Sequence, residues 1–159
     1  MAPVTTLERL TADLTTSMKA RTAFRTNAVR QAIGAVRAAQ KSGPAARDLT
    51  EDQVRAVLGA EVKKRRESAQ IYTGVGALER AATESAEADL IEAYLPAAIS
   101  EEQLNQIVAD AIAAIGARSV KDMGKVMKAA NASAADLGRV DGKALSDRVR
   151  RALQGAPTQ

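Results

Sequence analysis

The chain lacks histidine and cysteine entirely, and its 159 residues include one Phe, two Tyr and no Trp. Histidine is the usual general base at neutral pH, and Cys nucleophiles, disulfides, iron–sulfur clusters and most zinc sites depend on Cys or His. These absences remove most enzyme chemistry and favour a binding protein over a catalyst. We predict no catalytic residue, no metal site and no cofactor.

The composition is that of a mildly basic, helix-forming protein. Hydrophobic residues make up 46% of the chain, although many of them are Ala, and charged residues make up 26%. The net charge of +4 and the pI of about 9.6 permit a nucleic-acid partner without requiring one. The sequence contains no run of about 18 apolar residues, and its N-terminus has no basic region followed by an apolar stretch. We therefore expect a cytoplasmic protein with no membrane partner.

Helix signals recur along the chain, whereas the alternating pattern of strands is missing. Thr5, Thr50 and Ser100 each precede Glu or Gln by three residues, which predicts a capping box at the start of three helices. We expect further helices over 22–41 and 77–94, a short one starting at Ser119, and a last one capped by Asp141. Helical spacing predicts that the following apolar residues face inward: Leu7, Leu10, Leu14 and Met18; Val29, Ile33 and Val36; Leu104, Ile107, Val108, Ala111, Ile112 and Ile115; Leu145, Val149 and Leu153.

These signals predict an all-α protein built from two helical modules. Pro96 disfavours helix at Leu95 and cannot continue a helix interior, so we place a hinge there. The expected domains are a module of about four helices over 1–95 and a module of three helices over 96–154. Residues 155–159 are expected to form a flexible tail.

Charge is distributed unevenly, with basic segments on both sides of an acidic one. Residues 67–95 contain six Asp or Glu and one Arg, so the fourth helix is acidic and is predicted to pack beside the basic third helix. The basic run 63–66 spreads around a helix instead of forming one surface. Within that run, Arg65 falls on the apolar side one turn after Glu61, which favours a structural ion pair over a nucleic-acid contact.

A second group of cations behaves differently. At 100° per residue, Lys121, Lys125 and Lys128 fall within an arc of about 60°, opposite an apolar face. Two interpretations stay open: a solvated helix face, or an array that neutralises the phosphates of a nucleic acid. Because aromatic residues are so few, stacking on single-stranded bases is disfavoured, and recognition of folded RNA by backbone and shape is the alternative. Further cations that would extend the array are Arg139, Lys143, Arg148, Arg150 and Arg151.

Four segments, taken in order, resemble the YqeY-like proteins. They are Glu-Val-Lys-Lys-Arg-Arg-Glu-Ser-Ala at 61–69, Glu-Ala-Tyr-Leu-Pro at 92–96, Lys-Asp-Met-Gly-Lys-Val-Met at 121–127, and Asp-Gly-Lys-Ala-Leu-Ser at 141–146. YqeY-like proteins are similar to the C-terminal tail of GatB, a subunit of the tRNA-dependent amidotransferase. Six residues of these motifs are expected to have structural roles: Glu61, Arg65, Tyr94, Pro96, Met123 and Gly124.

The resemblance implies an all-helical fold and a link to tRNA. It also implies association with a carbon–nitrogen ligase that uses glutamine as amido-N-donor. The catalytic body of GatB, with its metal and ATP chemistry, lies outside the tail and has no counterpart here, so no catalytic site is expected. The partners implied are tRNA, or a tRNA-modifying or aminoacylation-linked enzyme, with Lys121, Lys125 and Lys128 as the RNA-facing residues and Arg139 and Lys143 assisting. The alternative hypothesis is a protein-interaction adaptor that binds no nucleic acid and docks a partner in the groove between the modules or on the acidic fourth helix, with 84–92 as the segment to mutate. A third hypothesis, an amide-forming enzyme, would need a complete site within this chain, and the sequence indicates none.

Overall fold

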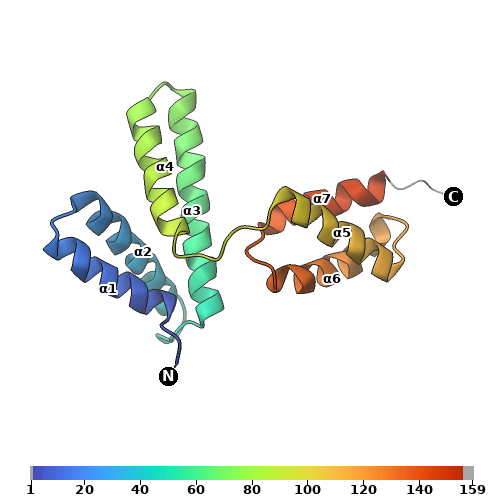
Figure 1. The fold of residues 1–159 in the computed structure, drawn as a ribbon, viewed down its shortest axis with the longest axis horizontal. Coiled ribbons are helices and arrows are strands. Elements are labelled where there is room, and N and C mark those ends of the chain that lie inside the picture. Colours follow the sequence, from blue (N-terminus) through green and yellow to red (C-terminus); the bar gives the residue numbers. More distant parts are fainter. Residues whose placement is uncertain (1, 156–159) are drawn as a thin grey trace. The chain divides into compact units, whose positions relative to one another are not determined.

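The computed structural model describes residues 2–155, and the regular structure in this range is helical (Figure 1). No strand occurs between these residues, and the all-α prediction is confirmed. None of the helices is long and apolar enough to span a bilayer. Of the expected tail, residues 156–159 lie outside the described part of the chain. The elements are α1 (Thr6–Lys19), α2 (Ala23–Lys41), α3 (Glu51–Gly74), α4 (Leu78–Glu92), α5 (Glu101–Ile115), the 3₁₀ turn η1 (Val120–Asp122), α6 (Met123–Ala135) and α7 (Gly142–Gln154).

The chain divides into two compact units between Leu95 and Pro96. Unit 1 contains α1–α4 and unit 2 contains α5, η1, α6 and α7. Each unit has its own cluster of buried apolar side chains. The role of Pro96 as a hinge stays a prediction.

Unit 1 consists of two antiparallel helical hairpins, α1–α2 and α3–α4, which meet at one end and diverge toward their turns (Figure 1). The predicted inward positions of α2 are confirmed, because Val29, Ile33 and Val36 are all buried. Side chains from all four helices form the core where the hairpins meet. Its members are Leu10, Val29, Ala32, Ile33, Val36, Val54, Leu58, Val62, Ala88, Ile91, Tyr94 and Leu95.

The prediction for Met18 is wrong, since this side chain is 52% exposed. The last turn of α1 extends past the core, and there the contact between α1 and α2 is made by small polar side chains. The Thr26 hydroxyl lies 3.1 Å from the Ser17 hydroxyl in a buried hydrogen bond. Met18 lies outside this contact, with its sulfur 3.9 Å from the Arg30 guanidinium.

Most helices begin where the sequence predicts, including α7, which Asp141 caps. The capping boxes at Thr5, Thr50 and Ser100 are all present, because each needs only side chains three residues apart. The helix expected to start at Ser119 is different. Ser119 caps the 3₁₀ turn, and α6 begins at Met123, because the Asp122 carboxylate accepts a hydrogen bond from the backbone N–H of Arg118 at 3.1 Å.

Unit 2 is a three-helix bundle in which the predicted faces of α5 and α7 are buried, apart from the end of α5. Ile112 is half-buried and Ile115 is 40% exposed, so the inward prediction for Ile115 is wrong. Gly116 then ends α5 in the left-handed conformation, with φ of 68°. The buried side chains of the unit are Leu104, Ile107, Val108, Ala111, Val126, Ala130, Ala134, Leu145, Val149 and Leu153.

The loop between α6 and α7 is tied to the segment that leads into α5. The Ile99 N–H donates to the Arg139 carbonyl at 2.9 Å, and the Arg139 N–H donates to the Ala97 carbonyl at 3.1 Å. Gly138 makes this approach possible. Its φ is 155°, and a Cβ placed there would lie 2.5 Å from the Ala97 carbonyl oxygen.

Candidate nucleic-acid interface

The three lysines predicted to contact RNA all lie on the surface of unit 2. Lys121 belongs to η1, whereas Lys125 and Lys128 belong to α6, and each side chain is exposed. Within residues 2–155 none of the three ammonium groups makes an ion pair or a side-chain hydrogen bond. Three cations therefore remain available to an external anion.

Burial of one side of α6 explains why these lysines face solvent. Val126 and Ala130 are fully buried, and Met123 and Met127 are half-buried against the core of unit 2. A helix buried on that side presents the opposite side to water. Because η1 turns by about 120° per residue instead of 100°, Lys121 is rotated from its predicted direction by about 20° for each residue of the turn.

Gly124 leaves open space beside the lysines. It lies one turn before Lys128 on α6, and a Cβ built there would meet no heavy atom within 4 Å. The helix is therefore smooth at this point. An extended phosphate backbone can approach the helix surface closely where no side chain intervenes.

The other basic residues of unit 2 are placed less favourably for a partner. Lys143 is exposed at the start of α7, but Arg139 is half-buried and its backbone is held by the 97–99 segment. Arg148 donates to Glu101 and Asn105 of α5, and Arg150 lies 3.7 Å from Asp147. Of the cations that the sequence suggests, those exposed and without an ion pair among residues 2–155 are thus the three lysines, with Lys143 and Arg151 as exposed additions from α7.

Arg65 has the structural role that the helical spacing indicates. It is 6% exposed, and its guanidinium lies 2.5 Å from the Glu61 carboxylate in the predicted i,i+4 pair. Two partners from other helices were not predicted: Glu87 of α4 at 3.3 Å and the Gln31 side-chain oxygen of α2 at 2.6 Å. Arg65 therefore joins three helices of unit 1, and no pattern within one helix indicates that.

Ion pairs connect α3 and α4, as the opposite charges of the two segments predict. Arg66 lies 2.6 Å from Asp89 and 2.9 Å from Glu92, and these hydrogen bonds raise the pKa of its guanidinium above the usual value. With Glu87 bound to Arg65, three carboxylates of segment 84–92 already have a partner within the chain. This segment therefore offers a protein partner less uncompensated charge than its sequence suggests.

Tyr94 is the buried centre of a second polar cluster, whose other members are partly exposed and which the sequence does not indicate. Its hydroxyl donates to the Asp13 carboxylate, the Arg25 guanidinium lies 3.5 Å from the same hydroxyl, and Arg9 stacks 5.3 Å from the ring centre. Burial, followed by the hydrogen bond to Asp13, raises the pKa of Tyr94 to about 12. The cluster fixes the end of α4 to α1 and α2, through partners about 70 and 80 positions away in sequence.

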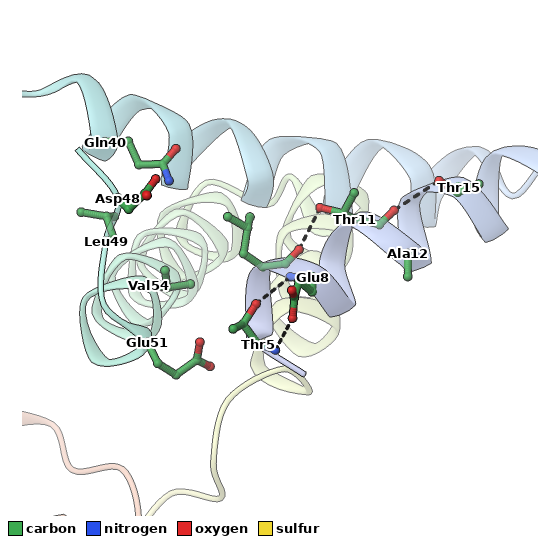
Figure 2. A pocket seen from close by; sticks show the side chains of 11 residues that line it. Thr5, Glu8, Thr11, Ala12, Thr15, Gln40, Asp48, Leu49, Glu51 and Val54 are labelled. Atoms are coloured by element: carbon green, nitrogen blue, oxygen red, sulfur yellow. Dashed lines mark hydrogen bonds between the residues drawn. The ribbon is translucent and has the colours of Figure 1, made fainter. Parts of the chain in front are cut away.

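An open groove of about 740 Å³ lies between α1, the end of α2 and the start of α3 (Figure 2). Its polar groups are largely engaged with the protein itself. Glu8 caps α1, Glu51 accepts the Thr6 N–H at 3.1 Å, and the Thr11 hydroxyl donates to a carbonyl of its own helix. Across residues 2–155 no group of three acidic side chains is placed to hold a metal ion. The groove therefore shows no convergent set of binding groups.

Comparison with known proteins connects these features to one family. A family model described as Yqey-like protein matches residues 7–153, which includes both units and all three lysines. No curated protein matches the chain.

Proposed function

The chain belongs to the YqeY-like family, and from that membership together with the lysines of unit 2 we propose that it is an accessory RNA-binding protein with tRNA as its ligand. Lys121, Lys125 and Lys128 neutralise phosphates of the folded RNA, and Lys143 assists. The protein itself supplies no bond-making chemistry in this proposal. In this proposal the protein either brings tRNA to a glutamine-dependent amidotransferase or contacts such an enzyme.

The observation that carries the proposal is that three neighbouring cations, one on η1 and two on α6, are exposed and make no ion pair within residues 2–155. Lys125 lies four positions after Lys121, and Lys128 lies three positions after Lys125, so the ammonium groups are spread over about 10 Å along the axis. Nucleic-acid backbones carry a charge every few Å, and release of their counterions drives binding to such an array. Among the Arg residues of the same unit, Arg148 and Arg150 have amide or carboxylate partners, whereas Arg118 and Arg151 are exposed and make no ion pair within residues 2–155.

Shape recognition fits this surface better than base recognition does. Unit 2 contains no aromatic residue, because the one Phe and both Tyr lie before Pro96. Single-stranded bases are usually held by stacking on aromatic rings, which is worth about 1–3 kcal/mol per base. We therefore expect binding that tolerates changes of sequence and requires a folded, partly double-stranded RNA.

The test is a titration of the full chain with tRNA at several salt concentrations. The proposal predicts binding near 50–100 mM salt, with a log–log slope of about −0.9 for each phosphate contact. Substituting Ala at Lys121, Lys125 and Lys128 together should make the slope shallower by about 3. A binding curve that is absent at low salt, or unchanged in the triple variant, would disprove it.

The matched control removes three lysines from unit 1. Lys41, Lys63 and Lys64 are exposed, so replacing them by Ala lowers the net charge equally without touching α6. This variant should keep most of the affinity and most of the slope. An equal loss in both variants would indicate attraction by net charge alone and not a defined interface.

A further inference from the structure

The end of the α3–α4 hairpin exposes large apolar side chains that the rest of unit 1 does not cover. Ile71, Val75 and Leu78 border its turn and are 67%, 74% and 64% exposed. Between the two helices near this end, the buried positions are Ala69 and Ala81. Small residues thus fill the inside of the hairpin at this end, while larger aliphatic side chains face water. We call residues 67–79 the tip.

The tip is acidic. Residues 67–79 contain two carboxylates, Glu67 and Glu79, and no cation; both are exposed and make no ion pair within residues 2–155. Arg80, the next residue, keeps its charge and is stacked 5.8 Å from the Tyr72 ring centre, so it offsets only one of the two carboxylates. Glu67, Ile71 and Val75 succeed one another at intervals of four residues, so a carboxylate accompanies the apolar side chains on one side of α3. A complementary surface would have to be both apolar and basic.

The opposite hairpin of unit 1 ends in such a surface. Met18 and Phe24 lie next to the α1–α2 turn and are 52% and 43% exposed. Lys19 and Arg21 lie between them in sequence, are exposed, and make no ion pair among the described residues. The whole segment 14–47 contains seven Lys or Arg and no Asp or Glu. We call residues 18–24 the corner.

We propose that the tip of one copy of this chain docks on the corner of a second copy. Complementary charge and exposed apolar area identify the occupant, since each end offers what the other lacks. The two hairpins diverge from their shared core within unit 1 (Figure 1), so the tip and the corner of one molecule do not face each other. The contact is therefore made between molecules.

The geometry of the contact sets its strength and its possible symmetry. Few side chains take part on either side, so the association is weak and concentration-dependent, as small transient interfaces are. Tip on corner pairs two different surfaces. Two copies form a closed dimer when each inserts its tip on the other's corner about a two-fold axis. Otherwise each copy leaves a free tip or corner, and longer assemblies form.

The experiment measures the mass of the full chain by analytical ultracentrifugation after nuclease treatment, across a range of protein concentrations. The proposal predicts a mass that rises above the 16.7 kDa of one chain and falls again when salt is added. A tip variant, Ile71→Ser with Leu78→Ser, and a corner variant, Met18→Ser with Phe24→Ser, should each raise the dissociation constant about tenfold or more. Val4→Ser, which also removes an exposed aliphatic side chain, is the control and should associate as the natural chain does.

Mixing the two variants separates this contact from any other mode of association. The tip variant keeps an intact corner and the corner variant keeps an intact tip, so the mixture should form a one-to-one heterodimer at concentrations where each alone is monomeric. A natural chain that stays at the mass of one copy overturns the proposal. A mixture that stays monomeric, or variants that associate unchanged, overturns it too. None of these outcomes depends on the lysines of unit 2, so the RNA proposal is tested separately.

Discussion

Replacing Arg65 by Met should destabilise unit 1 although it leaves the apolar core intact. The Met side chain retains the packing of the Arg stem but removes the charge. The Glu61 and Glu87 carboxylates then face each other without a cation, and the Gln31 oxygen loses its donor. The expected loss of stability is therefore caused by the two carboxylates and the amide oxygen that remain without a partner.

The magnitude follows from the burial of these groups. Breaking a buried ion pair from one side costs roughly 3–5 kcal/mol. The Glu61 and Glu87 side chains are still 22% and 17% exposed, so water compensates part of the charge. We expect the free energy of unfolding of unit 1 to fall by about 3 kcal/mol, at the low end of that range.

Tyrosine fluorescence during a urea titration is the suitable assay, because Tyr72 and Tyr94 both lie in unit 1 and the chain has no Trp. A loss of about 3 kcal/mol lowers the urea midpoint by about 1–3 M for typical slopes of about 1–3 kcal/mol per M. Lys64, the exposed residue before Arg65, provides the control. Lys64→Met should change the free energy of unfolding by less than about 0.5 kcal/mol.

A rescue variant tests the cause directly. Adding Glu61→Gln and Glu87→Gln to Arg65→Met removes the uncompensated charges and should recover at least half of the loss. If Arg65→Met behaves like Lys64→Met, or if the Gln substitutions recover nothing, the argument from buried charge is refuted.

Two further predictions concern other single positions. Gly138→Ala places a Cβ against the Ala97 carbonyl and should destabilise unit 2 by about 2 kcal/mol. Far-UV circular dichroism should detect this loss, while the tyrosine fluorescence transition of unit 1 should not shift. Gly124→Ala, at a helix position with open space around it, should be neutral or stabilising by up to about 1 kcal/mol. Because the folded-state pKa of Tyr94 is raised from 10.0 to about 12, its stabilisation is complete below pH 10 and is lost as pH rises from 10 through about 12. Tyr94→Phe should lower stability at neutral pH by about 1 kcal/mol and abolish this part of the alkaline loss; an unchanged alkaline profile contradicts the assignment.

Positions that depend on one helix alone were predictable. The capping boxes at Thr5, Thr50 and Ser100 involve residues three apart, and the Glu61–Arg65 pair involves residues four apart. Helical periodicity also identified the buried faces of α2 and α7, since a helix hides one side whatever packs against it. The exposure of Lys121, Lys125 and Lys128 follows from the same rule.

Positions near helix ends were predicted less well. Periodicity extends a stripe to Met18 and Ile115, but the core ends before the helix does in both cases. Ser119 has the sequence of a helix cap, yet the side chain of Asp122 turns back to Arg118 and delays the helix. At Met18 and Ile115 the local pattern competes with the extent of the neighbouring helices, which a single segment does not encode; at Ser119 it competes with another local hydrogen bond.

By itself, the sequence determined that the protein is helical, where most helices begin, which of their sides are apolar, and that His- and Cys-based chemistry is missing. Such properties depend on residues a few positions apart and on backbone geometry that every helix shares. Tertiary structure alone decided that Tyr94 meets Asp13, that Arg148 meets Glu101, and that the rest of unit 1 leaves the α3–α4 tip uncovered. Contacts of this kind join residues distant in the chain, and they exist only once the helices have packed, because packing sums many weak contacts that no short segment contains.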